Sequence, residues 1–394
     1  MYYKIINRKK LFLTRAADLL GYAAFAPFKL LGLSGRHINP GDIREILVVR
    51  TAYIGDVVMT LPVLGPIKNT FPNARLTFLA CSAARDMLAA NPHIDSVIAY
   101  DAFWFYKKSG LARYLRLVNE LRRKRFDLVV EARGDIRDIF LIAYLSGARH
   151  RISYGVGGGG FLLTDIVPFE RIRHRVDYHM DIARRLGAAP GALDWGVMPG
   201  KTHFSNAEAL LSLNNPNAGG PVVGIHAGGR KELKRWGKER YAALAGELVS
   251  RRNARVFFTG ATEDYPLIDG IIKGAGRGAV NLAGKTDLLT LSALLKRLDV
   301  FITNDSSVLH LASAVKCPCV AVFGPSKSNE TGPYANPTSR VVEKDFPCRE
   351  TCDEDLCLHG VHNECMSAIS VDDVLNAVDY ALTARQGGYY GVQA

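Results

Sequence analysis

Short runs of apolar residues alternate along the chain with longer segments in which apolar residues recur at helical spacing. The runs in EILVVR, ARLTFLA, DSVIAY and DLVVEAR are bounded by charged or turn residues, as buried strands are. Between the last two runs, ARYLRLVNELRRKR places Leu115, Val118 and Leu121 on one helical face. Strands that alternate with helices form a parallel sheet through crossover connections. Residues 41–200 are therefore predicted to form a Rossmann-like domain.

The same pattern restarts after a stretch rich in glycine, proline and asparagine. Residues 201–220 are predicted to be the linker, and the runs in PVVGIHAGG, ARVFFTG, DVFITND and CVAVFGPS then indicate four strands. Residues 221–394 are predicted to form a second Rossmann-like domain. The expected fold class is α/β, with two facing domains whose parallel sheets leave a cleft at the carboxyl ends of the strands, where open α/β sheets bind ligands.

The first 40 residues are both basic and apolar. They hold seven lysines and arginines against one acid, Asp18, and their apolar stretch over 11–33 is also interrupted by Arg15, Pro27 and Lys29. Charges inside the stretch argue against a membrane-spanning helix and against a signal peptide. Two interpretations stay open. The segment is either a basic amphipathic segment on an anionic membrane surface or an N-terminal helix packed on the protein's own core.

The net charge indicates which classes of partner the chain would bind. The net charge of the 394 residues is +12, which favours anionic partners such as nucleotides, phosphorylated glycans or an acidic membrane surface. A nucleic-acid partner is not expected, because the chain lacks a recognition module and a platform of interleaved basic and aromatic residues.

Four of the seven cysteines form a cluster with the spacing C-x3-C-x4-C-x7-C, namely Cys348, Cys352, Cys357 and Cys365. This spacing differs from the paired C-x2-C of zinc ribbons. Reduced thiols in a compact loop are favoured, a structural zinc site comes next, and disulfides come last. In each case we expect a structural role at a distance from the reacting groups.

The turn after the first strand carries an unusual carboxylate. In ILVVRTAYIGDVV one glycine, Gly55, precedes Asp56, where a dinucleotide site would carry G-x-G-x-x-G. The dipole at a helix start favours the ionised carboxylate, so Asp56 is a candidate general base. A helix cap without catalytic function is the alternative.

Three strand–helix junctions of the second domain carry groups suited to an anion. Paired glycines let backbone amides approach a phosphate, basic side chains neutralise it, and helix N-termini attract it. The candidate donor-site residues are His226, Gly228, Gly229, Lys234, Arg235, Trp236, Asp305, Ser306, Ser307 and His310. For Trp236 and His310 a place in the core is the alternative, and Asp305 or Ser306 is alternatively a helix cap. Together these junctions predict a nucleotide diphosphate site.

Several arginines follow strands of the first domain and suit an acidic acceptor: Arg50, Arg133, Arg137, Arg149 and Arg151. Guanidinium groups bind phosphate and carboxylate groups through paired hydrogen bonds. Arg133 and Arg137 are the strongest candidates, because they flank ARGDIRD at the carboxyl end of a predicted strand.

These motifs, in this order, resemble the heptosyltransferases of glycosyltransferase family nine. The resemblance covers about residues 45–385 and is carried by VVRTAYIGDVVMTLPVL, FDLVVEARGDIRD, LSGARHRISYGVGGGGFLLT, TNDSSVLHLASA, VAVFGPS and CRETCDEDLCLHGVHNECMSAI. It implies the two-domain GT-B fold and an inverting, metal-independent transfer of a sugar, most often heptose from ADP-heptose, onto the lipopolysaccharide core. It also implies a lipid-linked glycan acceptor, no required cofactor, and a peripheral place on the cytoplasmic face of the inner membrane.

The resemblance also implies roles for individual residues. Asp56 takes the place of the catalytic base, Lys234 that of the lysine on the donor phosphate, and residues 305–310 that of the donor-binding helix entry. Ser307 and Val308 stand where the family commonly has glycine and proline, which leaves another nucleotide sugar open as donor. A two-domain nucleotide-sugar epimerase is the alternative enzyme. If Asp56 is the base, Asp56→Asn is expected to keep its melting temperature and lose transfer, and Glu131 and Asp135 are the next candidates.

Overall fold

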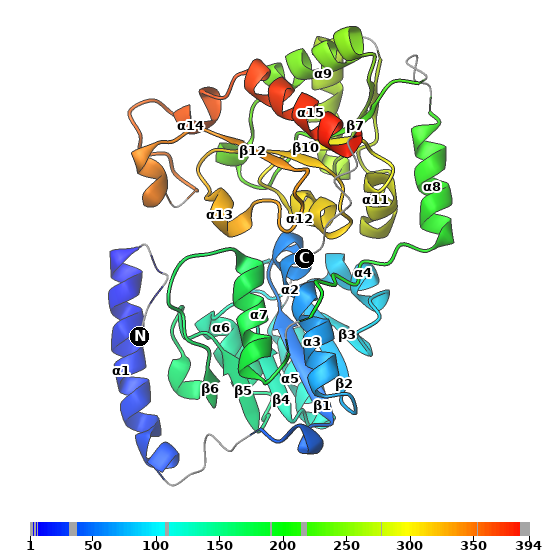
Figure 1. Ribbon diagram of the computed structural model, residues 1–394. Coiled ribbons are helices and arrows are strands. Elements are labelled where there is room, and N and C mark those ends of the chain that lie inside the picture. The colour runs from blue at the N-terminus through cyan, green and yellow to red at the C-terminus, as the bar shows by residue number, and fades with distance from the viewer. Residues whose placement is uncertain are drawn as a thin grey trace. The chain divides into compact units, whose positions relative to one another are not determined.

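The computed structural model describes residues 3, 5, 7–30, 38–106, 110–189, 191–213, 219–276, 278–352 and 354–386. The chain divides into two compact units, Met1–Gly196 and Val197–Ala394. Each unit contains a six-stranded sheet whose described strand pairs are all parallel (Figure 1). The predicted boundaries differ from this division, because residues 201–211 of the expected linker form helix α8 (Lys201–Leu211), which belongs to the second unit.

The first sheet has the strand order β3-β2-β1-β4-β5-β6. Its strands are β1 (Glu45–Arg50), β2 (Arg75–Ala80), β3 (Ser96–Ala99), β4 (Leu128–Glu131), β5 (His150–Ser153) and β6 (Asp165–Ile166). After β1, the chain adds β2 and β3 on one side of this strand and then crosses over to add β4, β5 and β6 on its other side. The strand order therefore reverses between β1 and β4. Val49 pairs with Glu131 in the register, so the groups that follow β1 and β4 emerge at the same edge. Such a switch point is where open α/β sheets bind ligands.

The second sheet repeats this plan with the strand order β12-β11-β10-β7-β8-β9. Its strands are β7 (Val222–His226), β8 (Arg255–Phe258), β9 (Ala279–Asn281), β10 (Val300–Asn304), β11 (Cys319–Phe323) and β12 (Arg340–Glu343). The reversal lies between β7 and β10, where Thr303 pairs with His226. The residues after these two strands are therefore neighbours.

Helices connect the strands of both sheets. The first unit contains α1 (Arg8–Leu30), α2 (Ile54–Thr60), α3 (Leu64–Thr70), α4 (Arg85–Ala89), α5 (Leu111–Lys124), α6 (Ile136–Asp138), a π-helical segment η4 (Ile139–Tyr144), the 3-10 turn η5 (Gly160–Leu162) and α7 (Arg175–Arg185). The second unit contains α8, the 3-10 turn η6 (Glu232–Lys234), α9 (Lys238–Arg252), α10 (Tyr265–Ala275), α11 (Leu288–Leu295), α12 (Ser307–Ala314), α13 (Ser328–Thr331), α14 (Glu364–Ser367) and α15 (Val371–Gln386).

Helix α5 buries a different face from the predicted one. Val118 and Leu121 are buried as expected, but Leu115 is 52% exposed. Tyr114 and Leu117 take its place in the core beside β4. The prediction was wrong at Leu115 because it left out Tyr114, which lies on the buried face of α5. The Tyr114 hydroxyl donates a hydrogen bond to the Leu141 carbonyl and so holds that face against η4.

Helix α1 packs on the first unit through one face. Its acid, Asp18, is 2% exposed and accepts hydrogen bonds from the Tyr3 hydroxyl and the Gly159 amide, each at 2.7 Å. Tyr22 and Phe25 contact the Phe161 ring at centroid distances of 6.0 and 5.4 Å. The open question of the N-terminal segment is thus answered in part, because one face of α1 does pack on the protein.

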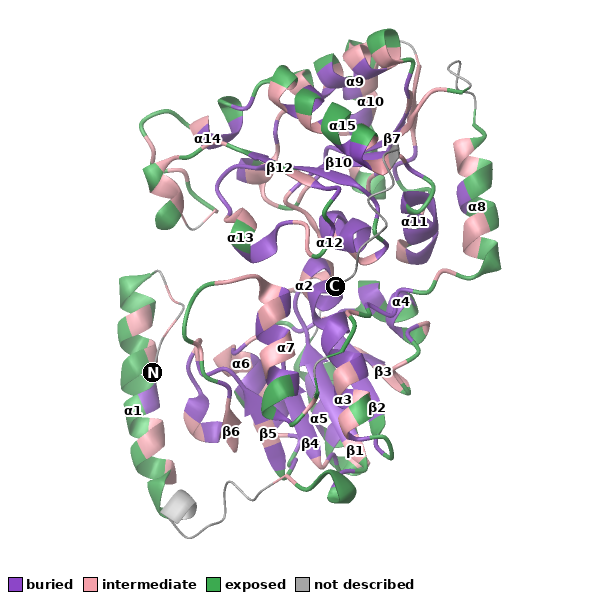
Figure 2. Ribbon diagram, in the orientation of Figure 1, coloured by how far each residue is buried: buried purple, intermediate pink, exposed green. Residues whose placement is uncertain are grey.

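The opposite face of α1 is apolar and open to solvent. Phe12, Leu13, Leu19 and Leu20 are between 66% and 72% exposed, and most of the helix is coloured as exposed in Figure 2. Residues seven apart, such as Phe12 and Leu19, lie on the same side of a helix. Across the described part of the chain, no helix is both long enough and apolar enough to cross a membrane.

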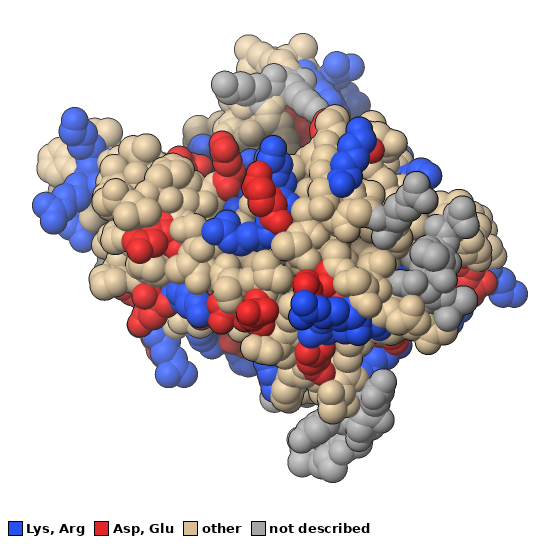
Figure 3. All heavy atoms as spheres, turned by 90° about the horizontal axis from the view of Figure 1, so that it is seen from above, with Lys and Arg blue, Asp and Glu red and all other residues tan. Residues whose placement is uncertain are grey.

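Charged side chains of both signs are mixed on the face shown in Figure 3, where blue and red groups lie next to each other. This arrangement differs from the continuous basic stripe of a nucleic-acid-binding surface.

Candidate active site

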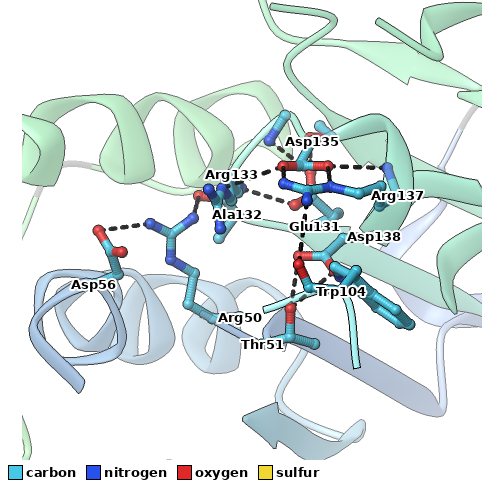
Figure 4. Close-up of polar contacts among 12 residues, drawn as sticks. Arg50, Thr51, Asp56, Trp104, Glu131, Ala132, Arg133, Asp135, Arg137 and Asp138 are labelled. Carbon is cyan, nitrogen blue, oxygen red and sulfur yellow. Dashed lines mark hydrogen bonds and ion pairs between the residues drawn. The ribbon is translucent and has the colours of Figure 1, made fainter. Parts of the chain in front are cut away.

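Asp56 lies in the first turn of α2, directly beyond the carboxyl end of β1. Its Oδ1 atom lies 2.8 Å from a guanidinium nitrogen of Arg50 and 2.8 Å from one of Arg175. Arg50, at the end of β1, is buried and also donates a hydrogen bond to the Ala132 carbonyl beyond β4 at 3.2 Å (Figure 4). Both arginines use Oδ1, and Oδ2 receives no hydrogen bond from the described residues. One carboxylate oxygen is therefore held and the other is available to a ligand.

The charge of Asp56 is fixed by its neighbours. Burial alone would raise its pKa, but the positive charges of Arg50, Arg175 and Arg133 outweigh burial and hold the pKa of Asp56 far below its ordinary range. The carboxylate is thus ionised at every physiological pH. Neutralising it would leave the buried Arg50 without its counter-charge, and a broken buried pair costs several kcal/mol, about 3–5. We therefore expect Asp56→Asn to melt below the parent, in place of the parent-like melting temperature expected from the sequence alone.

Glu131, at the end of β4, is fully buried and held by three donors. Its carboxylate accepts hydrogen bonds from the Gly134 amide at 2.7 Å, the Arg133 amide at 3.1 Å and the Ser153 hydroxyl at 2.5 Å. Gly134 has φ +75°, and a Cβ there would lie 2.8 Å from the Tyr154 carbonyl oxygen, so the turn requires glycine. Burial and the charge of Asp138 raise the pKa of Glu131 to about 8. Glu131 shapes the loop and is not exposed to a ligand.

Asp138 is a second buried carboxyl group near the end of β1. It accepts hydrogen bonds from the Thr51 hydroxyl at 2.8 Å and from the Trp104 indole nitrogen at 2.9 Å. Burial, with the charge of Asp135 next, raises the pKa of Asp138 to about 6. No local pattern in the sequence points to this group, because its partners lie 87 and 34 residues away along the chain.

The two predicted acceptor arginines lie together over one aromatic ring. The guanidinium carbons of Arg133 and Arg137 lie 4.3 and 4.5 Å from the centroid of Phe105. Asp135 binds Arg137 through two hydrogen bonds, at 2.8 and 2.7 Å, and lies 3.5 Å from Arg133. The Nη1 atom of Arg133 is buried and has no hydrogen-bond partner among the described residues. Arg133 therefore has donor capacity left for an anionic ligand.

The other candidate arginines have structural partners or face solvent. Arg151 donates to the carbonyls of Leu162 and Ala148, at 2.8 and 2.5 Å, and Arg50 is committed to Asp56. Arg149 is exposed. Sequence reasoning missed Arg175, which stands at the start of α7, 119 residues from the carboxylate that it binds.

His179, also on α7, was missed as well. Its ring nitrogens lie 2.7 and 2.9 Å from the carbonyl oxygens of Met59 and Ala132. Burial lowers the pKa of His179 to about 4, so the ring is neutral and its single N–H donates to one of these two carbonyls, which links α7 to the end of α2 or of β4.

In the second unit, Lys234 lies at the centre of the predicted donor site. Its ammonium is 2.7 Å from Asp305, which follows β10, and 2.9 Å from Glu354. Burial disfavours the charged lysine, but the two carboxylates outweigh burial and raise the pKa of Lys234. The same interaction lowers the pKa of Asp305 against the effect of its own burial. Lys234 is thus a fixed positive charge at the carboxyl edge of the second sheet.

Asn304 holds the loop that carries Lys234. Its amide nitrogen donates to the carbonyls of Ala227 and Gly228, each at 3.1 Å, and its oxygen accepts from the Trp236 amide and the Tyr241 hydroxyl. Arg235 donates to the Gly229 carbonyl at 2.8 Å. All of the hydrogen-bonding groups of the Asn304 side chain are used, so it is a positioning residue that the sequence analysis missed.

Trp236 and His226 are less accessible than predicted. Trp236 is 1% exposed in the core of the second unit, where its indole donates to the Ile369 carbonyl at 3.0 Å. It offers no ring face to a base or sugar, and the donor-site assignment of Trp236 is corrected to a core residue. His226 is buried at the end of β7, 3.4 Å from the Thr259 hydroxyl.

The start of α12 has no side-chain cap. Ser306 occupies the N-cap position without a capping hydrogen bond, and its hydroxyl lies 3.0 Å from that of Thr303. Asp305 binds Lys234, so the alternative that Asp305 or Ser306 acts only as a cap is not what the structure has. Ser307 begins the helix, and His310 is buried in it.

The cysteine cluster lies on a loop that reaches Lys234 of the predicted donor site. Glu354 stands between Cys352 and Cys357 in the sequence and binds both Lys234 and Lys231, at 2.9 and 3.3 Å. None of the seven cysteines forms a disulfide. Within the described ranges, no group of three or more His, Cys, Asp or Glu side chains is arranged to hold a metal ion, so the structure gives the alternative of a zinc site no support. Glu354 thus brings this loop to Lys234, and the expected distance between the cysteines and the reacting groups stays a prediction.

Comparison with known proteins agrees with this architecture. The profile of glycosyltransferase family 9 (heptosyltransferase) matches residues 114–360. The lipooligosaccharide heptosyltransferase 2 of Haemophilus influenzae is 25% identical over 324 residues, which are 76% of this chain and 89% of that protein.

Two solved structures share the fold. The glycosyl transferase family 9 protein of Veillonella parvula superposes with a TM-score of 0.75 at 21% identity, over 89% of this chain and 99% of that one. The ADP-heptose LPS heptosyltransferase II of E. coli gives a TM-score of 0.69 at 22% identity, over 87% and 99%. These likenesses confirm the predicted GT-B fold class.

Asp138→Asn should change how stability depends on pH. Because folding raises the Asp138 pKa from 3.8 to about 6, its contribution to stability is fully present below about pH 4 and is lost as the pH rises through about 6. Asparagine can accept from Trp104 and donate to Thr51 without titrating. Urea unfolding should therefore show that the variant gains roughly 2–3 kcal/mol on the parent between pH 4 and 7.5, at about 1.36 kcal/mol per pKa unit.

The matched control for this experiment is Asp165→Asn, which makes the same change at a carboxylate paired with Arg185 on the surface. Parallel stability curves for the parent and Asp138→Asn would contradict the assignment.

Proposed function

The chain belongs to glycosyltransferase family 9, and on that premise we propose that it transfers heptose from ADP-heptose, with inversion, onto a lipopolysaccharide core or a related envelope glycan. The observation that carries the proposal is the carboxylate of Asp56, which is kept ionised by two arginines through Oδ1 while Oδ2 is left for a ligand. The E. coli relative named above uses ADP-heptose by its own name, and the Haemophilus relative acts on a lipooligosaccharide.

Asp56 is the proposed general base. The hydroxyl oxygen of the acceptor attacks the anomeric carbon, its proton passes to Oδ2 of Asp56, and the bond between that carbon and the diphosphate oxygen breaks. A carboxylate of low pKa is a weak base, so the proton moves late, when the forming bond has made the hydroxyl acidic. Arg133 and Arg137 are the proposed ligands for acidic groups of the acceptor.

The second unit supplies the proposed donor site. The leaving diphosphate gains negative charge as its bond to the sugar breaks, and Lys234 with the uncapped start of α12 would stabilise that charge. Glu354 now occupies part of the lysine's hydrogen-bonding capacity, so a bound diphosphate would compete with it. In this scheme the charge of Lys234 stabilises the leaving diphosphate, and no cofactor is required.

The Asp56→Asn variant tests the proposed base. Loss of a general base lowers kcat by about two to four orders of magnitude. The variant should also unfold at lower urea concentration, because Arg50 loses its counter-charge. Transfer from ADP-heptose is therefore measured at a temperature where circular dichroism shows the variant folded, and the rate is divided by the folded fraction.

Asp165→Asn serves as the control with the same chemical change and should keep the parent rate. A folded Asp56→Asn protein with a kcat within threefold of the parent would remove Asp56 from the role of base.

We further infer that the enzyme lies on an anionic membrane surface through α1, as expected for an enzyme with a lipid-linked acceptor on the cytoplasmic face of the inner membrane. The outward face of α1 carries Phe12, Leu13, Leu19 and Leu20, and its N-terminal half carries the exposed Arg8, Lys9, Lys10 and Arg15. The acid of the helix, Asp18, points inward to Gly159 and opposes no lipid charge. Apolar side chains beside basic ones are the composition of an interfacial helix.

The double substitution Leu13→Glu/Leu20→Glu should abolish this association. Both side chains are exposed, so the melting temperature should stay within about 2 °C of the parent. Sedimentation with phosphatidylglycerol vesicles should show at least a tenfold lower bound fraction, and the parent should bind phosphatidylcholine vesicles more weakly.

Leu111→Glu/Leu115→Glu, at exposed sites on α5, is the matched control. Equal sedimentation of the α1 variant and the parent would refute the membrane assignment.

A further inference from the structure

The first unit contains an apolar cavity beside the acceptor arginines. Its volume is about 390 Å³, within the range of small-molecule sites. The walls come from Phe25 of α1, from Phe140, Leu141 and Tyr144 of η4, and from Phe161 of η5, and Arg137 is the charged residue among them. A cavity with these walls suits a hydrocarbon and offers little to a sugar or a nucleotide.

Two of the cavity walls also belong to surfaces described above. Phe25 lies on α1, whose outward face we assign to the membrane. Arg137 lines the cavity and also packs, with Arg133, on Phe105. The accessible lining of the cavity is apolar, so Arg137 contributes carbon atoms of its side chain there, while its guanidinium binds Asp135. The cavity therefore lies next to the groups that we assign to the acidic part of the acceptor. A ligand with an anionic head and an apolar chain matches both parts.

The backbone around the cavity is unusual. The segment Ile139–Tyr144 is π-helical, a rare conformation that is frequent at functional sites. It turns Phe140 and Tyr144 so that their rings stack at a centroid distance of 6.2 Å and an interplanar angle of 21°. Phe140 nevertheless remains 44% exposed, which marks the open side of the cavity. The exposed part of this ring is apolar surface that a hydrocarbon chain at the opening would cover.

We propose that this cavity binds one acyl chain of the lipid-linked acceptor and so helps to place the acceptor glycan near Asp56. The proposal rests on the proposed function in one respect, namely that the acceptor carries acyl chains. The binding of a free fatty acid tests the cavity without that premise.

The first experiment measures binding of cis-parinaric acid, a fatty acid whose fluorescence rises in an apolar site. The parent should bind it saturably with one site per chain. Phe140→Asp places a carboxylate at the opening, and Leu141→Trp fills part of the cavity, so each should weaken binding at least tenfold. The controls Leu115→Asp and Leu115→Trp make the same changes at an exposed site on α5 and should bind as the parent does.

A stability measurement and one further variant keep this result interpretable. Leu141 also packs against the buried core, so Leu141→Trp is compared only if it unfolds like the parent, whereas Phe140→Asp changes a half-exposed side chain. Leu13→Glu/Leu20→Glu should keep full affinity, because those residues lie on the other face of α1. Absence of saturable binding to the parent, or parent-like affinity in Phe140→Asp, would overturn the proposal and leave the cavity to another occupant, such as a second copy of the chain.

The second experiment compares an acylated acceptor with the same glycan after removal of its acyl chains. The ratio of kcat/KM for the two acceptors should fall about tenfold in Phe140→Asp and stay unchanged in Leu115→Asp. An unchanged ratio in Phe140→Asp would contradict the acyl-chain assignment. Failure of the parent to transfer heptose to either acceptor would refute the proposed function instead. The fatty-acid measurement would still show whether the cavity binds an acyl chain.

Discussion

The ion pair between Arg50 and Asp56 governs the arrangement at the edge of the first sheet. Arg50 ends the central strand β1 with a buried guanidinium, which needs a counter-charge at that place. Asp56 provides it, and Arg175 joins from α7, so strand, helix and distant helix are held at one carboxylate oxygen. A glycine-rich turn would leave room for a pyrophosphate here. The carboxylate instead fills the turn with a fixed negative charge, which suits a site that accepts a proton better than one that binds an anion.

The apolar runs predicted β1, β2, β3 and β4 and then β7, β8, β10 and β11, because buried parallel strands have a strong local signal, but they did not predict β5, β6, β9 and β12. The side-chain partners could not be predicted in the same way. Arg175 and Glu354 lie 119 and 120 residues from the groups that they bind, Asp56 and Lys234, and only the folded chain brings them together. Local pattern also failed at Leu115, where an aromatic neighbour, Tyr114, took the buried position.

Residue type alone indicated the right place but the wrong role at Trp236. Trp236 lies beside the proposed donor site, yet its indole is part of the core. The side chain of Asn304 instead forms the hydrogen bonds that hold that loop. The cysteine loop reaches Lys234 through Glu354, although cysteine spacing carries no information about the residues between. The sequence of helix α1 likewise did not decide between two structural roles. Its sequence fits both a packed helix and a membrane-lying one, and the fold uses one face for packing and leaves the other to solvent.

We propose that transfer depends on a carboxylate kept ionised by two arginines. The most direct test is the pH dependence of kcat/KM for the acceptor at saturating ADP-heptose, measured with the intact chain between pH 5 and 8. A base whose pKa lies far below its ordinary range stays ionised throughout this window, so the account predicts no loss of rate toward pH 5 from protonation of the base. A tenfold fall per pH unit below an apparent pKa of about 6–8 would contradict it and assign the proton to a group with a raised pKa, such as Asp138 or Glu131.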